Sequence, residues 1–345
     1  MAAITNTVLT AAAVGNRETL SDIVSMITPT DTPIYTLAGM EKLTGKHPEW
    51  EIESLRSPAA NAQAEGDDYV FNAQQIPTRL GNYTQISSDS WVYSNTQQAV
   101  DNAGNQEKAA KAKIKAGINV RKDIELAIVT NQASVATGIR YSGSLPSWLT
   151  TNTSRNSGSN GGYSSGTGLT VAETTGTQRA FTQALLDTVM QSVFNAGGNV
   201  ADVIVSPYNK GVFVSFMSNA NVASFRQDIG PGPKTGKGAG PNSVSGIGSS
   251  NTLIGTYDYY QGPFGTVQVM PNRVMANSAA VARRAYLIDP DMISVGMLRP
   301  IQEDPDIAKT GDSQKGVVIG EWSLKVKNEA GLGVIADVFG LTAST

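Results

Sequence analysis

The sequence contains no cysteine and only one histidine, and these two scarcities exclude several kinds of chemistry. Without cysteine there is no disulfide, no thiolate nucleophile and no thiolate metal site. With His47 alone, neither a histidine metal cluster nor a triad with a second candidate base is available. His47 also stands directly before Pro48, which favours an ordinary loop residue. We therefore expect no bound metal and no cofactor.

Charged residues are scarce as well, at 16% of the chain, with 26 basic and 29 acidic side chains and a net charge of −3. General nucleic-acid binding needs a basic surface, so this balance argues against it. No apolar run reaches the roughly 18 residues of a membrane helix, and the first residues lack the basic segment of a signal peptide. We expect a protein that works in a cytoplasm-like compartment, away from membranes.

Several short motifs resemble catalytic or nucleotide-binding signatures but lack essential parts. The stretch 230–238 has neither the first glycine nor the final Ser or Thr of a phosphate loop. The stretch 331–336 resembles a dinucleotide fingerprint, but the nine residues after it are too few for the required helix and ribose-binding acid. We therefore expect no catalytic residues and no enzymatic activity. Two carboxylate pairs stand beside prolines, where turn chemistry explains them better than acid–base work: Asp289 with Asp291, and Asp304 with Asp306.

Alternation near the C-terminus predicts paired strands. Trp322, Leu324 and Val326 alternate with polar side chains, which is typical of a half-buried strand. The Asn- and Gly-containing turn at 328–331 predicts that residues 332–339 return as the antiparallel partner. Because a hairpin is not stable alone, we expect this one to complete a sheet formed by earlier parts of the chain.

The N-terminal region predicts an arm. Residues 19–22 have capping-box spacing, and an apolar stripe continues to Ile27, which together predict a short helix. Two prolines at 29–33 end that helix in a rigid turn.

Residues 48–93 predict a long β-hairpin. Clean alternation at 49–53 and 83–87 marks its two strands. Hairpin loops usually have about two to five residues, so a polar tip as long as 56–79 predicts a binding role, with a disordered excursion as the alternative. The tip carries three carboxylates: Glu65, Asp67 and Asp68.

Residues 96–131 carry the longest helical pattern, with Val120, Ile124 and Ile128 repeating every four positions. Between 108 and 122 the pattern holds six cations and no anion. Such a run is either a solvated helix face or a docking strip for an acidic partner. The six are Lys108, Lys111, Lys113, Lys115, Arg121 and Lys122.

The middle of the chain predicts helices packed against a sheet, in an α+β arrangement. Residues 138–180 are rich in Gly, Ser, Thr and Asn, which predicts a surface loop or lid. An amphipathic helix follows at 182–196, with apolar residues from Leu185 to Phe194 on one face. The remaining predicted elements are a buried strand at 203–205, a helix opened by Ser206-Pro207, a second glycine-rich insertion at 230–250, and strands at 266–270 and 285–288.

In this order the elements resemble the major capsid proteins of tailed bacteriophages, which share the Hong Kong 97-type fold. The resemblance covers nearly the whole chain. It is carried by their collinearity and by four stretches, of which the last is the strongest: 16–22 with 29–33, 143–148, 205–210, and 322–330. They are similar to one branch of short-tailed and siphovirus-type head proteins, sometimes labelled as a family of unknown function.

The resemblance implies a division of the chain into five parts. These are an N-terminal arm (1–46), an extended β-hairpin or E-loop (47–94), a spine helix with the first part of a peripheral domain (95–139), an axial domain (140–290) and the C-terminal strands of the peripheral domain (291–345). It also implies self-assembly into hexamers and pentamers of an icosahedral head that encloses double-stranded DNA. Scaffold and portal proteins are expected partners, a cement or decoration protein is an open alternative, and contact with packaged DNA is at most non-specific. Assembly is expected in the host bacterial cytoplasm.

The E-loop of each copy lies across its neighbour in that family, so the acidic tip and the cationic helix are our candidates for contact between subunits. Some relatives lock their shells with an isopeptide bond from an E-loop lysine. This chain has no lysine between Lys46 and Lys108, so we expect a non-covalent shell. Because Met1 is present, we also expect a scaffold encoded elsewhere. The candidates are Glu65, Asp67, Asp68, Lys108, Lys111, Lys115, Arg121 and Lys122.

Two other classes of protein stay open on the sequence. A secreted or surface-layer protein, or a tail adhesin, would use the Gly/Ser segments as ligand-facing loops, but it would show a signal peptide or trimeric repeats. A hydrolase is disfavoured by the residue inventory. Shells or ring-like capsomers in negative-stain images, against monomers or fibres, would distinguish them.

Overall fold

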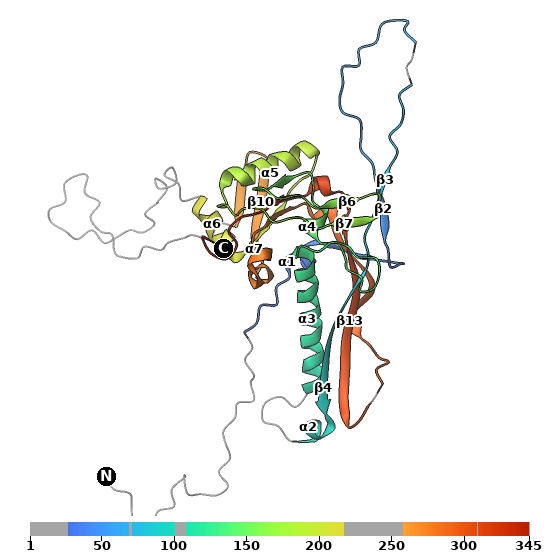
Figure 1. Ribbon diagram of the computed structural model, residues 1–345, viewed down its shortest axis with the longest axis vertical. Helices are drawn as coiled ribbons and strands as arrows, with labels where there is room; N and C mark the ends of the chain where they lie inside the picture. The colour runs from blue at the N-terminus through green and yellow to red at the C-terminus, as the bar shows by residue number, and fades with distance from the viewer. Residues whose placement is uncertain (1–26, 69–70, 101–107, 217–257, 309, 345) are drawn as a thin grey trace, which may run out of the picture.

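A computed structural model describes residues 27–68, 71–100, 108–216, 258–308 and 310–344. It combines a four-stranded sheet, a six-stranded sheet, one long helix and a projecting hairpin (Figure 1). The predicted helix at 19–27, apart from Ile27, and the insertion at 230–250 lie outside the described residues. So does the 230–238 stretch.

The four-stranded sheet carries the longest strands. Its order is β1 (Gly39–Lys42), β12 (Ile293–Glu303), β13 (Ser313–Val326) and β4 (Gln85–Ser94). Strand β1 is parallel to β12, and the other neighbours are antiparallel. The prediction for β13 is confirmed on one face, where Trp322, Leu324 and Val326 are buried in the core. The strand is not half-buried as predicted, because Glu321 and Ser323 on the other face are buried as well.

The spine of this half is α3 (Lys108–Val129), which is preceded by the short α2 (Asn95–Ala99). The four-residue repeat is confirmed, since Val120, Ile124 and Ile128 are completely buried and share one hydrophobic core with β13. The predicted helical stretch 96–131 is therefore two helices, and the residues between them lie outside the described part of the chain.

The six-stranded sheet belongs to the second half. Its order is β5 (Thr153–Ser154), β14 (Gly333–Ile335), β11 (Ala285–Ile288), β8 (Asp202–Val205), β10 (Gly265–Pro271) and β9 (Tyr259–Gly262). Helices α5 (Gln183–Ala196) and α6 (Pro207–Phe216) share a core with it. These elements confirm the predicted 182–196 helix, both later strands, the 203–205 strand and the helix after Ser206. Phe194 differs from the prediction, because it is mostly exposed.

The predicted C-terminal hairpin is wrong. Strand β13 pairs with β12 and β4, whereas β14 joins the other sheet between β11 and β5. The connecting turn is bonded to a distant segment rather than to a hairpin ladder: Asn152 Nδ2 donates to the carbonyls of Ala330 (2.7 Å) and Leu332 (3.1 Å). These bonds direct the chain from one sheet to the other.

The prediction of a loop or lid at 138–180 is also wrong. The segment contains α4 (Leu145–Trp148), β6 (Gly162–Ser164) and β7 (Leu169–Val171) as well as β5, and Trp148 is buried. Its glycines permit close packing, since a Cβ on Gly161 would lie 2.3 Å from the Pro146 carbonyl oxygen. Its polar groups find partners inside and outside the segment: the buried Glu173 carboxylate is paired with Arg155 and with the distant Arg284. A composition poor in large apolar residues therefore still forms an ordered, buried structure.

The remaining short elements complete the described chain. Helix α1 (Pro33–Leu37) packs on α3. Strands β2 (Glu49–Ile52) and β3 (Thr78–Gly81) form the base of the extended hairpin. The others are α7 (Ala279–Ala282), η3 (Val274–Asn277), η4 (Pro290–Met292) and η5 (Glu329–Gly331).

Candidate assembly surfaces

The tip of the extended hairpin projects from the body, whereas its base packs on the body (Figure 1). Strands β2 and β3 pair antiparallel only from Glu49 opposite Gly81 to Ile52 opposite Thr78. Beyond them, every described residue of 53–77 is exposed. Of the second strand predicted at 83–87, residues 85–87 instead belong to β4, which pairs with β13. The hairpin is therefore shorter in regular structure than predicted and has a long irregular tip.

Three carboxylates gather where the tip turns. The backbone N–H of Asp67 donates to the Ala64 carbonyl over 3.3 Å, and Gly66 supports the turn with φ +82°, a conformation that favours glycine. Glu65, Asp67 and Asp68 are all exposed. Arg79, predicted within the tip, lies at its base, 3.8–3.9 Å from Glu49 and Glu51. We refer to the three carboxylates as the acidic tip.

Large apolar side chains are exposed on the same hairpin. Leu55, Phe71 and Ile76 are each at least 89% exposed, so their own chain covers almost none of their surface. Isolated apolar residues on a surface are common, but three of them on one unsupported segment suit an interface with another molecule.

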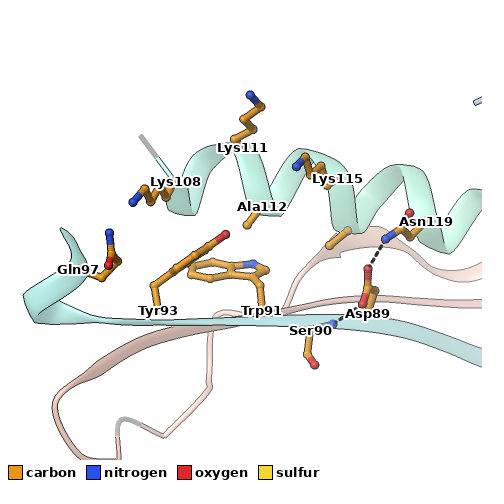
Figure 2. A pocket seen from close by; sticks show the side chains of 11 residues that line it. Asp89, Ser90, Trp91, Tyr93, Gln97, Lys108, Lys111, Ala112, Lys115 and Asn119 are labelled. Carbon is orange, nitrogen blue, oxygen red and sulfur yellow. Dashed lines mark hydrogen bonds between the residues drawn. The ribbon is translucent and has the colours of Figure 1, made fainter. Parts of the chain in front are cut away.

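The cationic helix faces β4 across a groove of about 770 Å³ (Figure 2). Lys108, Lys111 and Lys115 line its helical side, and Trp91 and Tyr93 line the opposite side, with ring centroids 6.2 Å apart. The Asn119 amide donates to Asp89 over 2.8 Å where the groove lining ends. We refer to this feature as the cationic groove. Its lysines and aromatic rings suit a partner that carries carboxylates and apolar side chains.

The predicted cations do not form one strip. Lys113 is paired with Glu303 of β12 over 2.6 Å, while Arg121 and Lys122 do not line the groove. The charge of Arg121 instead acts on the Tyr35 hydroxyl, whose pKa burial raises. Burial and then the Asp89 carboxylate raise the pKa of the nearby Asp123 carboxyl. Of the five cations named as contact candidates, which do not include Lys113, only Lys108, Lys111 and Lys115 therefore share one surface.

The acidic tip and the cationic groove do not meet within one chain. The hairpin leaves the body at the end that lies beyond the C-terminus of α3, whereas Lys108 begins the helix at its other end (Figure 1). Any contact between these two surfaces must therefore involve a second copy.

Sequence reasoning missed the aromatic side of the groove. The alternation recognised at 83–87 continues through β4 to Ser94, and its inward-facing positions include Asp89, Trp91 and Tyr93. Extending the period of two by six residues would have placed both rings on the face that packs toward α3. The pairing of that face with the lysine helix could not have been read from periodicity alone.

The described residues contain no cluster of three or more metal-ligating side chains, and no helix among them is long and apolar enough to cross a membrane. The acidic pairs have the predicted turn roles: Asp289 accepts from the Asp291 N–H over 3.1 Å, and Asp304 accepts from the Asp306 N–H over 3.2 Å.

Comparison with protein families decides the identity of the chain. Residues 3–339 match the model of the SU10 major capsid protein family. The chain belongs to this family. It is a phage major capsid protein and forms the capsid shell from many copies of itself, so the adhesin and surface-layer alternatives are not favoured.

Solved capsid structures share this fold at low sequence identity. A chain from Gordonia phage Cozz matches with a TM-score of 0.55 and 12% identity, over 97% of this chain and 96% of that one. A chain from the capsid of cyanophage P-SCSP1u matches with a TM-score of 0.54 and 12% identity, over 94% of this chain and 92% of that one. A chain from phage G, in a structure of its major capsid and decoration proteins, matches with a TM-score of 0.50 and 9% identity. The match covers 99% of this chain and 100% of that one. No curated protein matches.

Proposed function

We propose that the extended hairpin joins adjacent subunits of the shell, with its acidic tip in the cationic groove of a neighbouring copy. The observation that carries this proposal is the hairpin itself: an exposed segment with three carboxylates and three bare apolar side chains. The body offers a groove of complementary charge and aromatic character that the same chain does not reach.

The electrostatic part of this contact is small for each copy. Partly exposed ion pairs contribute about 0.2–1 kcal/mol each, so they set register and speed encounter more than they add affinity. Because a shell repeats the contact in every copy, even this term decides whether assembly is efficient.

The finer organisation follows the Hong Kong 97-type scheme, with the five predicted parts and one change at the C-terminal boundary. The long α3 supports the spine role, and the six-stranded sheet with α5 and α6 supports an axial domain. The opposite face of this sheet, which includes Tyr286 and Ile288, lies in the same core as α3. Strand β14 crosses the proposed boundary, since its residues pair within the axial sheet. The C-terminal part is therefore shared between the two domains.

The partners that we propose are other copies of this chain in hexamers and pentamers, a portal and a scaffold protein. Assembly takes place in the host cytoplasm and needs no cofactor. The shell encloses double-stranded DNA, and its contact with that DNA is at most non-specific. The phage G structure contains a decoration protein beside the capsid protein, which supports a similar partner here. The absence of a catalytic constellation in the sequence supports a structural protein without enzymatic activity.

Charge reversal at the tip tests the docking. The variant Glu65→Lys/Asp67→Lys/Asp68→Lys should fold normally but form few shells, because lysines would face lysines. The defect should be larger at low salt than at high salt, since salt screens the repulsion.

A control with the same change in net charge is Asp31→Lys/Asp291→Lys/Asp306→Lys, at three exposed carboxylates outside the hairpin. It should assemble normally. If the tip variant assembles as well as wild type at every ionic strength, the lysines of α3 have another role, such as facing packaged DNA in the lumen.

A further inference from the structure

The root of the extended hairpin, residues 80–84, is polar and yet deeply buried. Every described residue of the tip is exposed, but Leu80 is buried, and Asn82 and Thr84 are completely buried. Buried polar groups lower stability unless they are hydrogen-bonded, so the partners of these two side chains reveal what holds the root.

Asn82 connects three distant segments. Its Nδ2 donates to the Leu324 carbonyl of β13 over 2.6 Å and lies 3.1 Å from Ser142 Oγ. Its Oδ1 accepts from the backbone N–H groups of Gly143 (2.8 Å) and Tyr83 (2.9 Å). One amide thus ties the hairpin to the strand that packs on α3 and to the segment that follows α3.

Thr84 extends the same connection through a buried carboxylate. Its hydroxyl donates to Glu321 Oε1 over 2.8 Å, and Glu321 is only 5% exposed. Arg140 and Arg299 flank Glu321 at 2.6 and 3.1 Å, and Arg140 Nε also donates to the Thr84 carbonyl over 3.2 Å. Both charges and hydrogen bonds therefore fix the backbone at Thr84.

The other strand of the hairpin is held by aromatic packing. The Trp50 ring lies 5.5 Å from that of Trp148, which stacks on Tyr163. Backbone bonds join the two strands below the ladder: Asn82 N–H donates to Pro48 O, and Thr84 N–H to Lys46 O. Neither strand can rotate without breaking a buried contact.

We propose that Asn82 and Glu321 are positioning residues that fix the direction in which the hairpin leaves the body. This inference rests on the proposed docking of the tip on a neighbour. An arm of about 12 extended residues reaches about 40 Å, so a rotation of about 10° at the root displaces the tip by about 7 Å. Such a displacement is enough to move the acidic tip out of register with the cationic groove.

The experiment measures the direction of the hairpin apart from assembly. Because the chain has no cysteine, Ala62→Cys in the tip and Asn195→Cys on α5 can be spin-labelled selectively. Pulsed electron–electron double resonance measures the distribution of distances between the two spin labels. The labelled full-length chain is diluted in an excess of unlabelled chain. The test variant is Asn82→Asp, which turns the donor that faces the Leu324 carbonyl into an acceptor.

The matched control is Asn152→Asp. Asn152 is another buried asparagine whose Nδ2 donates to backbone carbonyls, but its partners are Ala330 and Leu332 rather than residues of the root. We expect Asn82→Asp to broaden or shift the distance distribution and to reduce shell yield, and Asn152→Asp to leave the distribution unchanged. An unchanged distribution in folded Asn82→Asp would overturn the inference.

A milder variant is used if circular dichroism shows that Asn82→Asp does not fold. Thr84→Val keeps the side-chain shape and removes one bond to Glu321, so it should broaden the distribution to a smaller extent; a wild-type distribution would again overturn the inference. The two proposals also fail separately. If tip reversal leaves assembly intact while Asn82→Asp broadens the distribution, the docking is wrong and the role of the root stands.

Discussion

Glu125 shows how much one side chain contributes to this fold. It lies on α3, is fully buried, and accepts from the backbone N–H groups of Ile34 (3.0 Å) and Tyr35 (2.8 Å) in α1. It also accepts from the Asn272 amide over 2.6 Å. A single carboxylate thus connects the N-terminal segment, the spine helix and the residue that follows β10.

The pKa of Glu125 gives the first prediction at this scale. Burial raises this pKa above 4.5, against the opposing effect of its three donors. The folded chain therefore holds the proton more tightly than the unfolded chain does. The resulting stabilisation is complete below pH 4.5 and is lost as the pH rises through the folded pKa.

Glu125→Gln removes this titration and leaves one donor unsatisfied, at a cost of about 1–3 kcal/mol. The free energy of unfolding of wild type minus that of the variant should fall as the pH rises from 4.5. Chemical denaturation across this range measures the difference, with the exposed Glu53→Gln as control. A difference that does not vary with pH would contradict the buried, raised pKa.

At the scale of elements, the cationic groove makes docking testable from the body side. The variant Lys108→Glu/Lys111→Glu/Lys115→Glu reverses the cations that line the groove, so it should block assembly as tip reversal does. Combining it with Glu65→Lys/Asp67→Lys/Asp68→Lys restores opposite charges and should recover much of the shell yield, as judged by sedimentation and negative-stain microscopy.

Lys113→Glu/Arg121→Glu/Lys122→Glu supplies the matched control, because it makes the same change in net charge at three residues that do not line the groove. Combined with the tip reversal, it should not recover assembly. Equal recovery by both combinations would mean that net charge, rather than a specific contact, governs the defect.

Elements with one buried face were predictable from the sequence, and their partners were not. The period of four in α3 and of two in β13 arises because each element turns one apolar side to the core, which the sequence records locally. The crossing from β13 to β14 depends on Asn152, nearly 180 residues away from the turn that it binds, so a local turn motif was read as a hairpin.

The same limit applies to the candidate site. Exposure of the acidic tip followed from its length and polarity, and three of the five candidate cations do line one groove. The buried Glu173 cluster and the root at Asn82 were missed, because polar residues become core only when distant partners satisfy them.

For the whole molecule, the sequence predicts a shell without covalent links. The hairpin holds no lysine from which an isopeptide bond could form, and no cysteine is present. Boiled and reduced particles should therefore give a single band near 36.2 kDa for this chain on a denaturing gel. A ladder of larger multimers of this chain would show a covalent link of another kind.

The central claim is that each hairpin lies across a neighbouring copy and places its acidic tip in the cationic groove. Cryo-electron microscopy of assembled shells tests it most directly. We predict Glu65, Asp67 and Asp68 of one copy within about 4 Å of Lys108, Lys111 or Lys115 of the next, the distance of an ion pair. A map in which the groove faces packaged DNA, with the acidic tip bound elsewhere or free, would contradict the account.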